Sequence, residues 1–276
     1  MKTIVITDSS ADVNAAEAAA LDLPVIRFPL IADGKSFIDD VEISFSEFKE
    51  RMLAKEKVGT SQASIGVYQD TFEALLKDYD QVIYVCISKG LSGAYQSACR
   101  VAEAFDNRVL VLDTRGVIYG QIYLVEQVRK MVEAGMSLSQ IKDLVENNET
   151  MTVTVVPEDI QYLKRGGRIT PTAAALANLL KICPVLIFKE GVIEALDKVR
   201  TFKKAIQVAE DYFDDCVFTD YQWWVSHGDS PELAEEVAKA MEAKVGLPVP
   251  VKLLYPVIMA HTGPGTIAIG RMKKLI

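Results

Sequence analysis

The strongest constraint on the fold is an alternation, over residues 1 to about 150, of short runs rich in Val and Ile with segments of helical periodicity. Residues 3–7, 82–87 and 109–112 have the composition of strands that are buried on both faces. Helical patterns follow the second and third of these runs, near residues 94–104 and 121–134. This βαβ rhythm predicts a domain with a parallel sheet.

Two further segments in this half carry local signals. Residues 23–40 contain two prolines and an Asp33-Gly34 turn between two extended runs, which predicts a hairpin or an excursion from the main sheet. Residues 60–79 begin with small polar residues and continue with apolar residues at helical spacing, so they predict a loop that leads into a helix.

After about residue 150 the pattern becomes α+β. The predicted strands are residues 151–156, a hairpin of 184–188 with 192–196, a strand around 223–225, and two final extended runs. The predicted helices are one ended by Gly166-Gly167, one that begins at Thr170-Pro171, one from Thr201, and one capped by Ser230-Pro231. We therefore expect an α/β domain over residues 1–150 and an α+β domain with a mixed or antiparallel sheet over residues 151–276.

Charge and hydropathy exclude several classes of protein. The chain has 30 Lys and Arg against 38 Asp and Glu, for a formal charge of -8, which disfavours DNA or RNA as a partner. The N-terminus lacks the apolar core of a signal peptide. Asn178, Lys181 and Pro184 interrupt the most apolar stretch, so it cannot supply the ~20 apolar residues of a membrane span. We expect a cytoplasmic protein.

The cysteines and histidines do not form a metal signature. The four cysteines are Cys86, Cys99, Cys183 and Cys216, without a C-x-x-C pair, and the chain has 2 histidines. We therefore expect reduced, buried cysteines and no metal site. The chain also lacks the Walker sequence and the G-x-G-x-x-G spacing, which disfavours autonomous binding of ATP or NAD.

Polar residues follow each predicted parallel strand. Asp8-Ser9-Ser10 follows the first strand, Ser88 to Gly93 the second, and Asp113-Thr114 the third. Ligands of open parallel sheets bind beyond these carboxyl ends, although helix capping explains each group equally well. Ser92, between two glycines at the start of a helix, is the most informative of them because the backbone there can approach an anion.

Three other groups stand out. Residues 60–64 supply three hydroxyls before a helix, for capping or for ligand contact. His261 follows an apolar run, which we interpret as extended, and precedes Thr262-Gly263-Pro264-Gly265; it is either a structural histidine or one aimed at a ligand. A basic island comprises Lys164, Arg165, Arg168, Lys198, Arg200, Lys203 and Lys204. Solvated helix ends explain the lysines, whereas Arg168 beside two glycines favours binding of a phosphate or carboxylate.

Together these motifs resemble the DegV family. The matching segments, in family order over nearly the whole chain, are Asp8-Ser9-Ser10-Ala11-Asp12, Thr60-Ser61-Gln62-Ala63-Ser64, Leu91-Ser92-Gly93-Ala94-Tyr95-Gln96-Ser97-Ala98, Leu163-Lys164-Arg165-Gly166-Gly167-Arg168-Ile169, Val199-Arg200-Thr201-Phe202-Lys203-Lys204-Ala205 and His261-Thr262-Gly263-Pro264-Gly265. The resemblance implies a two-domain bacterial protein that holds one long-chain fatty acid in a tunnel between its domains. It implies the fatty-acid-binding subunit of fatty acid kinase, in which a separate ATP-using subunit makes the acyl phosphate for phospholipid synthesis.

The resemblance also assigns roles to residues. It implies that the ligand is bound by Thr60, Ser61, Ser92, Gly93, Arg168, His261 and Thr262, with no cofactor. It implies that the kinase subunit docks on Arg168, Arg200, Lys203 and Lys204, and it is compatible with transient contact with a membrane surface. The sequence departs from the family pattern at Ala63, Ala94 and Phe202. Phe202 removes a charge from the docking stretch.

Physical chemistry agrees with such a ligand, and one enzymatic interpretation competes with it. An acyl chain with ~14 methylenes gains roughly 11 kcal/mol from burial at about 0.8 kcal/mol per CH₂, before ordering costs. The Ala-rich helix predicted at 173–180 and the apolar strands suit either a tunnel lining or an ordinary core. The alternative is a serine esterase or acyltransferase with Ser92 as nucleophile, His261 as base and Asp8 or Asp113 as orienting carboxylate.

Overall fold

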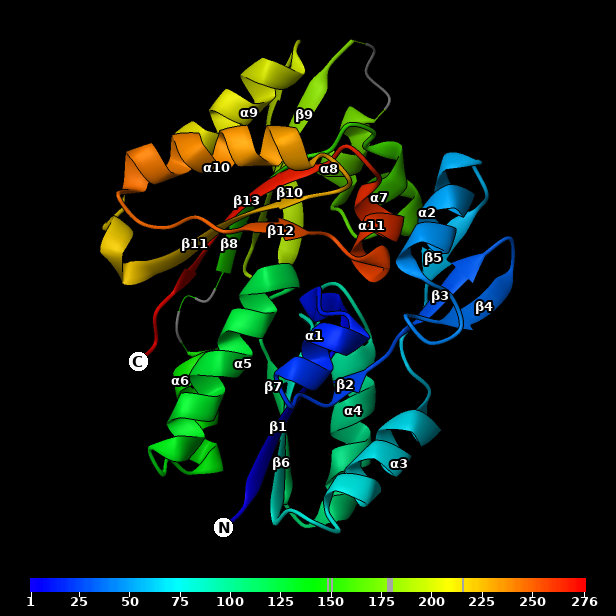
Figure 1. Ribbon diagram of the computed structural model, residues 1–276, viewed down its shortest axis with the longest axis vertical. Helices are drawn as coiled ribbons and strands as arrows, with labels where there is room; N and C mark the ends of the chain where they lie inside the picture. Colours follow the sequence, from blue (N-terminus) through cyan, green and yellow to red (C-terminus); the bar gives the residue numbers. More distant parts are fainter. Residues whose placement is uncertain (148, 150, 178–180, 215) are drawn as a thin grey trace. The chain divides into compact units, whose positions relative to one another are not determined.

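The computed structural model describes residues 1–147, 149, 151–177, 181–214 and 216–276 (Figure 1). The chain folds as two compact units. Unit 1 comprises Met1–Asn148 with Leu275–Ile276, and unit 2 comprises Glu149–Lys274. The last two residues thus belong to unit 1, where the Leu275 N–H donates to Gln127 Oε1 over 2.6 Å.

A four-stranded parallel sheet forms the centre of unit 1, in the order β2-β1-β6-β7. Its strands are β1 (Thr3–Asp8), β2 (Val25–Ile26), β6 (Gln81–Cys86) and β7 (Val109–Asp113). Consecutive residues of β1 and β6 are buried, as expected for strands covered on both faces. The prediction of a parallel sheet in this half is confirmed.

Helices accompany this sheet, and those that begin at Ala15, Ile65 and Leu138 have a side-chain cap. They are α1 (Ala15–Ala20), α3 (Ile65–Leu75), α4 (Ala94–Ala102), α5 (Ile118–Glu133) and α6 (Leu138–Glu146), with short 3₁₀ turns at Ser9–Ala11 and Glu103–Phe105. Ser64 caps α3, as its hydroxyl accepts from the Val67 N–H over 3.3 Å. Gly93 precedes α4 without a side-chain cap of its own, which leaves N–H groups of the first turn open to other acceptors.

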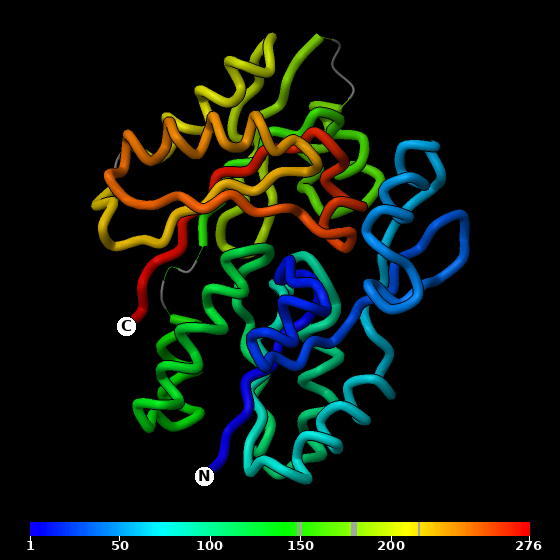
Figure 2. Tube along the Cα trace, in the orientation of Figure 1, coloured from blue at the N-terminus to red at the C-terminus, as the bar shows by residue number. Residues whose placement is uncertain are grey.

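A small antiparallel sheet of three strands, in the order β4-β3-β5, lies at one edge of unit 1, with its chain in blue in Figure 2. Its elements are β3 (Pro29–Ala32), β4 (Lys35–Ile38), α2 (Phe45–Leu53) and β5 (Val58–Thr60). The predicted hairpin is present: Asp33 and Gly34, with φ of 48° and 77°, form the two-residue turn between β3 and β4. β5 ends at Thr60, the first residue of the polar segment 60–64.

Unit 2 contains a six-stranded mixed sheet in the order β10-β9-β8-β13-β11-β12. The strands are β8 (Met151–Val156), β9 (Cys183–Lys189), β10 (Val192–Val199), β11 (Tyr221–His227), β12 (Val251–Leu253) and β13 (Ile267–Lys273). Only the β11 and β12 pairing is parallel among these described strands. The predicted fold class, a parallel-sheet α/β part followed by an α+β part with a mixed sheet, is confirmed.

Two long helices, α9 (Phe202–Asp211) and α10 (Pro231–Val245), pack on one face of this sheet. Trp223 and Val225 of β11 point into that core, and the period of two in a strand sends Trp224 and Ser226 to the other face. Three short helices, α7 (Gln161–Gly166), α8 (Pro171–Leu176) and α11 (Pro256–Thr262), complete the unit.

The structure corrects three predictions of local structure. The run before His261 is helix α11, not an extended segment, because Pro256 starts a helix at its first position. The helix predicted over residues 173–180 ends at Leu176, and its residues 178–180, with Asn178, lie outside the described residues. The four cysteines are free, but only Cys86 is buried, whereas the other three are partly exposed.

None of the helices in the described ranges has the length and apolar character that a membrane span requires.

Candidate functional site

The carboxyl edge of the parallel sheet carries the polar residues predicted from the sequence. From β1 the chain passes to β2 on one side of β1, and later returns to β6 on the other side. In open parallel sheets, ligands bind at such a reversal, beyond the carboxyl ends of the two central strands. The segments that follow β1 and β6 are therefore the candidate site of unit 1.

Asp8, at the end of β1, is a buried structural carboxylate. Its Oδ2 accepts from Tyr84 OH (2.8 Å) and the Ile87 N–H (3.0 Å), and its Oδ1 accepts from the Ser10 N–H (3.0 Å) and the Ser10 hydroxyl. Burial raises the pKa of Asp8, and these hydrogen bonds oppose that shift. Two of these donors, on Tyr84 and Ile87, join β1 to β6 and to the residue after it, and the two on Ser10 close the turn after β1, so this carboxylate serves the fold within unit 1.

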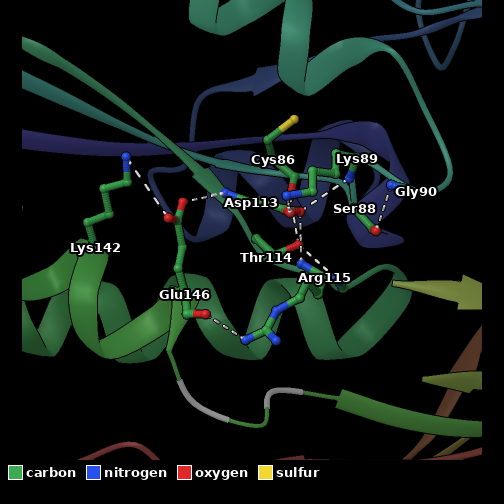
Figure 3. A network of polar contacts seen from close by, with 10 residues as sticks. Cys86, Ser88, Lys89, Gly90, Asp113, Thr114, Arg115, Lys142 and Glu146 are labelled. Atoms are coloured by element: carbon green, nitrogen blue, oxygen red, sulfur yellow. Dashed lines mark hydrogen bonds and ion pairs between the residues drawn. The ribbon is translucent and has the colours of Figure 1, made fainter. Parts of the chain in front are cut away.

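Asp113, at the end of β7, organises a second network (Figure 3). Its Oδ1 accepts from the backbone N–H groups of Lys89 and Arg115, both at 3.2 Å, and its Oδ2 lies 3.2 Å from Lys89 Nζ. The Arg115 guanidinium donates to the Glu146 carbonyl over 3.0 Å. Asp8 and Asp113, the two alternatives for the orienting carboxylate of a serine triad, are thus both engaged by neighbours in unit 1.

The loop after β6 presents Ser92 at the start of α4. The N–H groups of Leu91 and Ser92 both donate to the Ser88 carbonyl, at 3.0 and 3.2 Å, which folds the loop into a tight turn. The Ser92 hydroxyl accepts from the Ala94 N–H over 3.2 Å, so it fulfils the capping role that the sequence left open. An accepting hydroxyl keeps its own proton available for a ligand oxygen.

The segment 60–64 reaches this loop through one side chain. Gln62 Nε2 donates to Ser97 Oγ in the first turn of α4, over 2.9 Å. Gln62 Oε1 lies beside Gly93, where a Cβ atom would stand 2.7 Å from it. The structure therefore joins the predicted residues Thr60 and Ser61 to the Ser92 loop, and the joining residue, Gln62, was not among the predicted site residues.

In unit 2, helices α7 and α11 cross at glycines. A Cβ atom at Gly166 would collide with His261 Nδ1, and one at Gly263 would stand 2.6 Å from Tyr162 Cδ2. The Arg165 guanidinium lies 4.8 Å from the centroid of the Tyr162 ring. Since Tyr162 and Gly166 are one turn apart on α7, this helix face fixes the position of the His261 imidazole.

Arg168 lies beside that imidazole. Gly167, with φ of 67°, ends α7 in the left-handed conformation, and the Arg168 guanidinium folds back to donate to the Gly166 carbonyl. Burial lowers the pKa of His261 to about 4, and the positive charge of Arg168 adds to that shift. The imidazole is therefore neutral at pH 7, with one N–H donor and one acceptor.

Thr262, the residue after His261, forms hydrogen bonds through both its hydroxyl and its carbonyl. The Thr262 hydroxyl donates to the Ile258 carbonyl over 3.3 Å, and the Thr262 carbonyl accepts from the Thr266 hydroxyl over 2.8 Å. Gly265, with φ of 76°, donates its N–H to the Gly228 carbonyl over 2.6 Å. These bonds hold the loop 262–266 against the turn that follows β11.

The predicted basic island is two separate groups. Arg168 precedes Ile169, which pairs with Ile193 at the start of β10, whereas Arg200 follows Val199 at the other end of that strand. From Ile193 to Val199 the strand advances about 20 Å at ~3.3 Å per residue. Arg200, Lys203 and Lys204 are exposed around the start of α9, remote from Arg168. The prediction that they form one island was wrong because β10 separates them.

The candidate site is thus observed as two sets of residues. Within unit 1 the structure gathers Thr60, Ser61, Ser92 and Gly93, and within unit 2 it gathers Arg168, His261 and Thr262. Among the described residues, no group of three or more His, Cys, Asp or Glu side chains is arranged to hold a metal ion. The set in unit 1 offers hydroxyls and backbone N–H groups as hydrogen-bonding partners. The set in unit 2 offers a hydroxyl and one neutral imidazole, with a guanidinium beside it.

Comparison with known proteins gives consistent matches over the whole chain. A family model described as "Uncharacterised protein, DegV family" matches residues 2–274. A DegV domain-containing protein of Staphylococcus aureus (strain COL) is 31% identical over 278 residues, which cover 99% of each chain.

Solved structures show the same fold. A fatty acid (stearic acid)-binding protein from Eubacterium ventriosum superimposes with a TM-score of 0.88 at 26% identity, over 98% of each chain. A DegV family protein from Thermus thermophilus, described by its fatty acid binding, gives a TM-score of 0.86 at 29% identity, over 99% of this chain and 100% of that one. The sequence and the fold together show that this chain belongs to the DegV family.

Proposed function

We propose that this protein binds one long-chain fatty acid in a buried tunnel and presents the carboxylate to a separate ATP-using kinase subunit. The observation that carries the proposal is the similarity, over 98–99% of the chain, to solved proteins that are described as fatty acid binding. In this proposal the chain performs no chemistry of its own and needs no cofactor. The acyl phosphate made by the partner enters phospholipid synthesis in the cytoplasm.

The polar residues suit a carboxylate headgroup. We assign its binding to Thr60, Ser61 and Ser92 with the Gly93 backbone, and to His261 with Thr262, whereas Arg168, beside His261, serves mainly the docking of the kinase. The loop around Ser92 is folded by its own backbone bonds, so its hydroxyl is already in position when a ligand arrives. Neutral His261 can donate one hydrogen bond to a carboxylate oxygen, which leaves the other oxygen free to attack a phosphoryl donor.

The docking of the kinase rests on the exposed basic residues. Arg200, Lys203 and Lys204 are exposed at the start of α9 on a chain of formal charge -8. We propose that they, with Arg168, orient an acidic face or the nucleotide phosphates of the partner, since complementary charges mainly govern encounter and orientation. Phe202, partly buried between them, contributes no charge.

Mass spectrometry of an organic extract of the purified protein tests the ligand. We expect about one fatty acid per chain, and a folded preparation that stays free of lipid after incubation with palmitic acid would contradict the proposal. A fluorophosphonate probe tests the esterase alternative. A hydroxyl that only binds lacks the activation of a nucleophile, so we expect no labelling of Ser92.

A further inference from the structure

We propose that Gln62 is a positioning residue, which ties the Thr60–Ser61 segment to the Ser92 loop and thereby sets how fast a bound fatty acid leaves. Gln62 follows Ser61 in the first segment, and its side chain contacts the second at two points: Nε2 donates to Ser97 Oγ over 2.9 Å, and Oε1 lies against Gly93. The inference rests on the proposed function for the identity of the ligand, but the tie itself is a feature of unit 1 alone.

Apart from α3, which follows the first segment and packs against α4, the two segments are anchored to different parts of the unit. Thr60 ends β5 and pairs with Leu30, and the Ser61 N–H donates to the Pro29 carbonyl over 3.0 Å. These bonds attach the first segment to the small three-stranded sheet. The loop of Ser92 is instead folded on the Ser88 carbonyl and continues into α4, beside the parallel sheet.

The Gln62 side chain connects the first segment to α4. Its bond to Ser97 joins residues 35 apart in sequence. Because this bond is neutral and solvent-exposed, it is weak enough to break and reform during ligand exchange. When it breaks, the hydroxyls of the first segment are no longer held at a fixed distance from Ser92.

Gly93 provides the space that Gln62 occupies. Its φ is -73°, which an alanine adopts without strain, so the only obstacle to a Cβ atom there is Gln62 itself, with Oε1 at 2.7 Å and Cδ at 3.5 Å. Gly93→Ala therefore displaces the Gln62 amide while it leaves the loop backbone unchanged. This substitution disturbs the contact of Gln62 with the Ser92 loop at Gly93, without removing a hydrogen-bonding group.

Hydrogen exchange on ligand-free protein tests the tie. In Gln62→Ala and Ser97→Ala we expect faster exchange in peptides that cover residues 60–64 and 90–97, with no change in α5. The double variant should match the single ones, and Ser97→Thr, which keeps the hydroxyl, should exchange like the parent. The control is Gln69→Ala on α3, which removes an exposed hydrogen bond from another Gln side chain, to Glu73 Oε1 at 2.9 Å. Unchanged exchange in Gln62→Ala would overturn the proposal.

Transfer of radiolabelled palmitic acid from the protein to excess serum albumin tests the positioning role. We expect release about two- to tenfold faster in Gln62→Ala, Ser97→Ala and Gly93→Ala than in the parent and Gln69→Ala, at unchanged thermal midpoints. Faster exchange with unchanged release would make Gln62 a purely structural tie and overturn its positioning role. A parent protein that binds no palmitic acid would instead refute the proposed function, while the exchange measurements would still decide on the tie.

Discussion

Gly166 leaves the space beside its Cα atom to the imidazole of His261, which fills the contact between α7 and α11. The shape of this helix crossing consequently fixes the position of the imidazole. This contact makes the sequence Gly166-Gly167 a requirement of two kinds: the first glycine admits a histidine, and the second adopts a positive φ to end the helix.

Gly166→Ala should destabilise unit 2 by roughly 1–3 kcal/mol, because the new methyl group overpacks the helix crossing. Urea unfolding followed by tryptophan fluorescence measures this, since both tryptophans, Trp223 and Trp224, lie in unit 2. Gly166→Ala combined with His261→Ala should recover part of the loss. No recovery in the double variant would mean that the imidazole is not what the methyl group strikes.

The stability of unit 2 should fall as the pH falls below 6.5. The unfolded imidazole of His261 binds a proton near its ordinary pKa of 6.5, whereas burial keeps the folded one neutral down to about 4. The contribution of His261 to the free energy of unfolding is therefore fully present above pH 6.5 and is lost as the pH falls from 6.5 to 4. At pH 5 the loss amounts to about 2 kcal/mol. Urea midpoints at pH 7 and pH 5 should differ less in His261→Gln than in the parent. Burial also lowers the pKa of His227, which adds a dependence of the same sign in both proteins.

Ser92→Ala and His261→Ala should each weaken fatty acid retention by roughly 1–3 kcal/mol, because a buried carboxylate loses one of its hydrogen bonds. Folding should survive both changes, as thermal unfolding will show. The exchange of bound palmitic acid gives the measurement, with Ser46→Ala, an exposed serine of α2, as control. Equal exchange rates in all four proteins would place the carboxylate elsewhere.

Arg168→Ala and Arg200→Ala should leave the amount of bound fatty acid nearly unchanged and should lower acyl phosphate formation with the kinase subunit. Raised salt should lower it further in the parent protein. The two variants should differ in one respect: only Arg168→Ala should raise the pKa of His261, measured by NMR of its imidazole, because only Arg168 lies near it. Lys239→Ala, on the exposed face of α10, is the control for a lost surface charge. Equal loss of lipid and of phosphorylation would assign these arginines to the binding site instead.

The strands of unit 1 could be predicted because burial on both faces leaves a direct signal in the sequence, as in residues 82–85, which are fully buried. The helix that carries His261 could not be predicted from periodicity, since a short apolar run fits a strand or a helix equally well. The signal that distinguishes them was Pro256, which occupies the first helical position.

Relationships between distant segments were out of reach for a different reason. The role of Gln62 depends on Gly93 lying beside it, and nothing local in either segment indicates that contact. The separation of Arg168 from Arg200 likewise depends on the pairing of Ile169 with Ile193, which assigns the two arginines to opposite ends of one strand. Residue types near a site were predictable, whereas their grouping required the tertiary structure.

The pairing of Met151 in β8 with Met272 in β13 has a consequence for how unit 2 is built into the chain. Residues opposite each other on antiparallel strands have Cα atoms about 5 Å apart, so unit 2 starts and finishes at nearly one point. Unit 2 thus begins after Asn148 and ends at Lys274, and only Leu275 and Ile276 of unit 1 follow it. Residues 149–274 can therefore be excised as a fragment, or their ends joined by a linker of a few residues, without rethreading any strand.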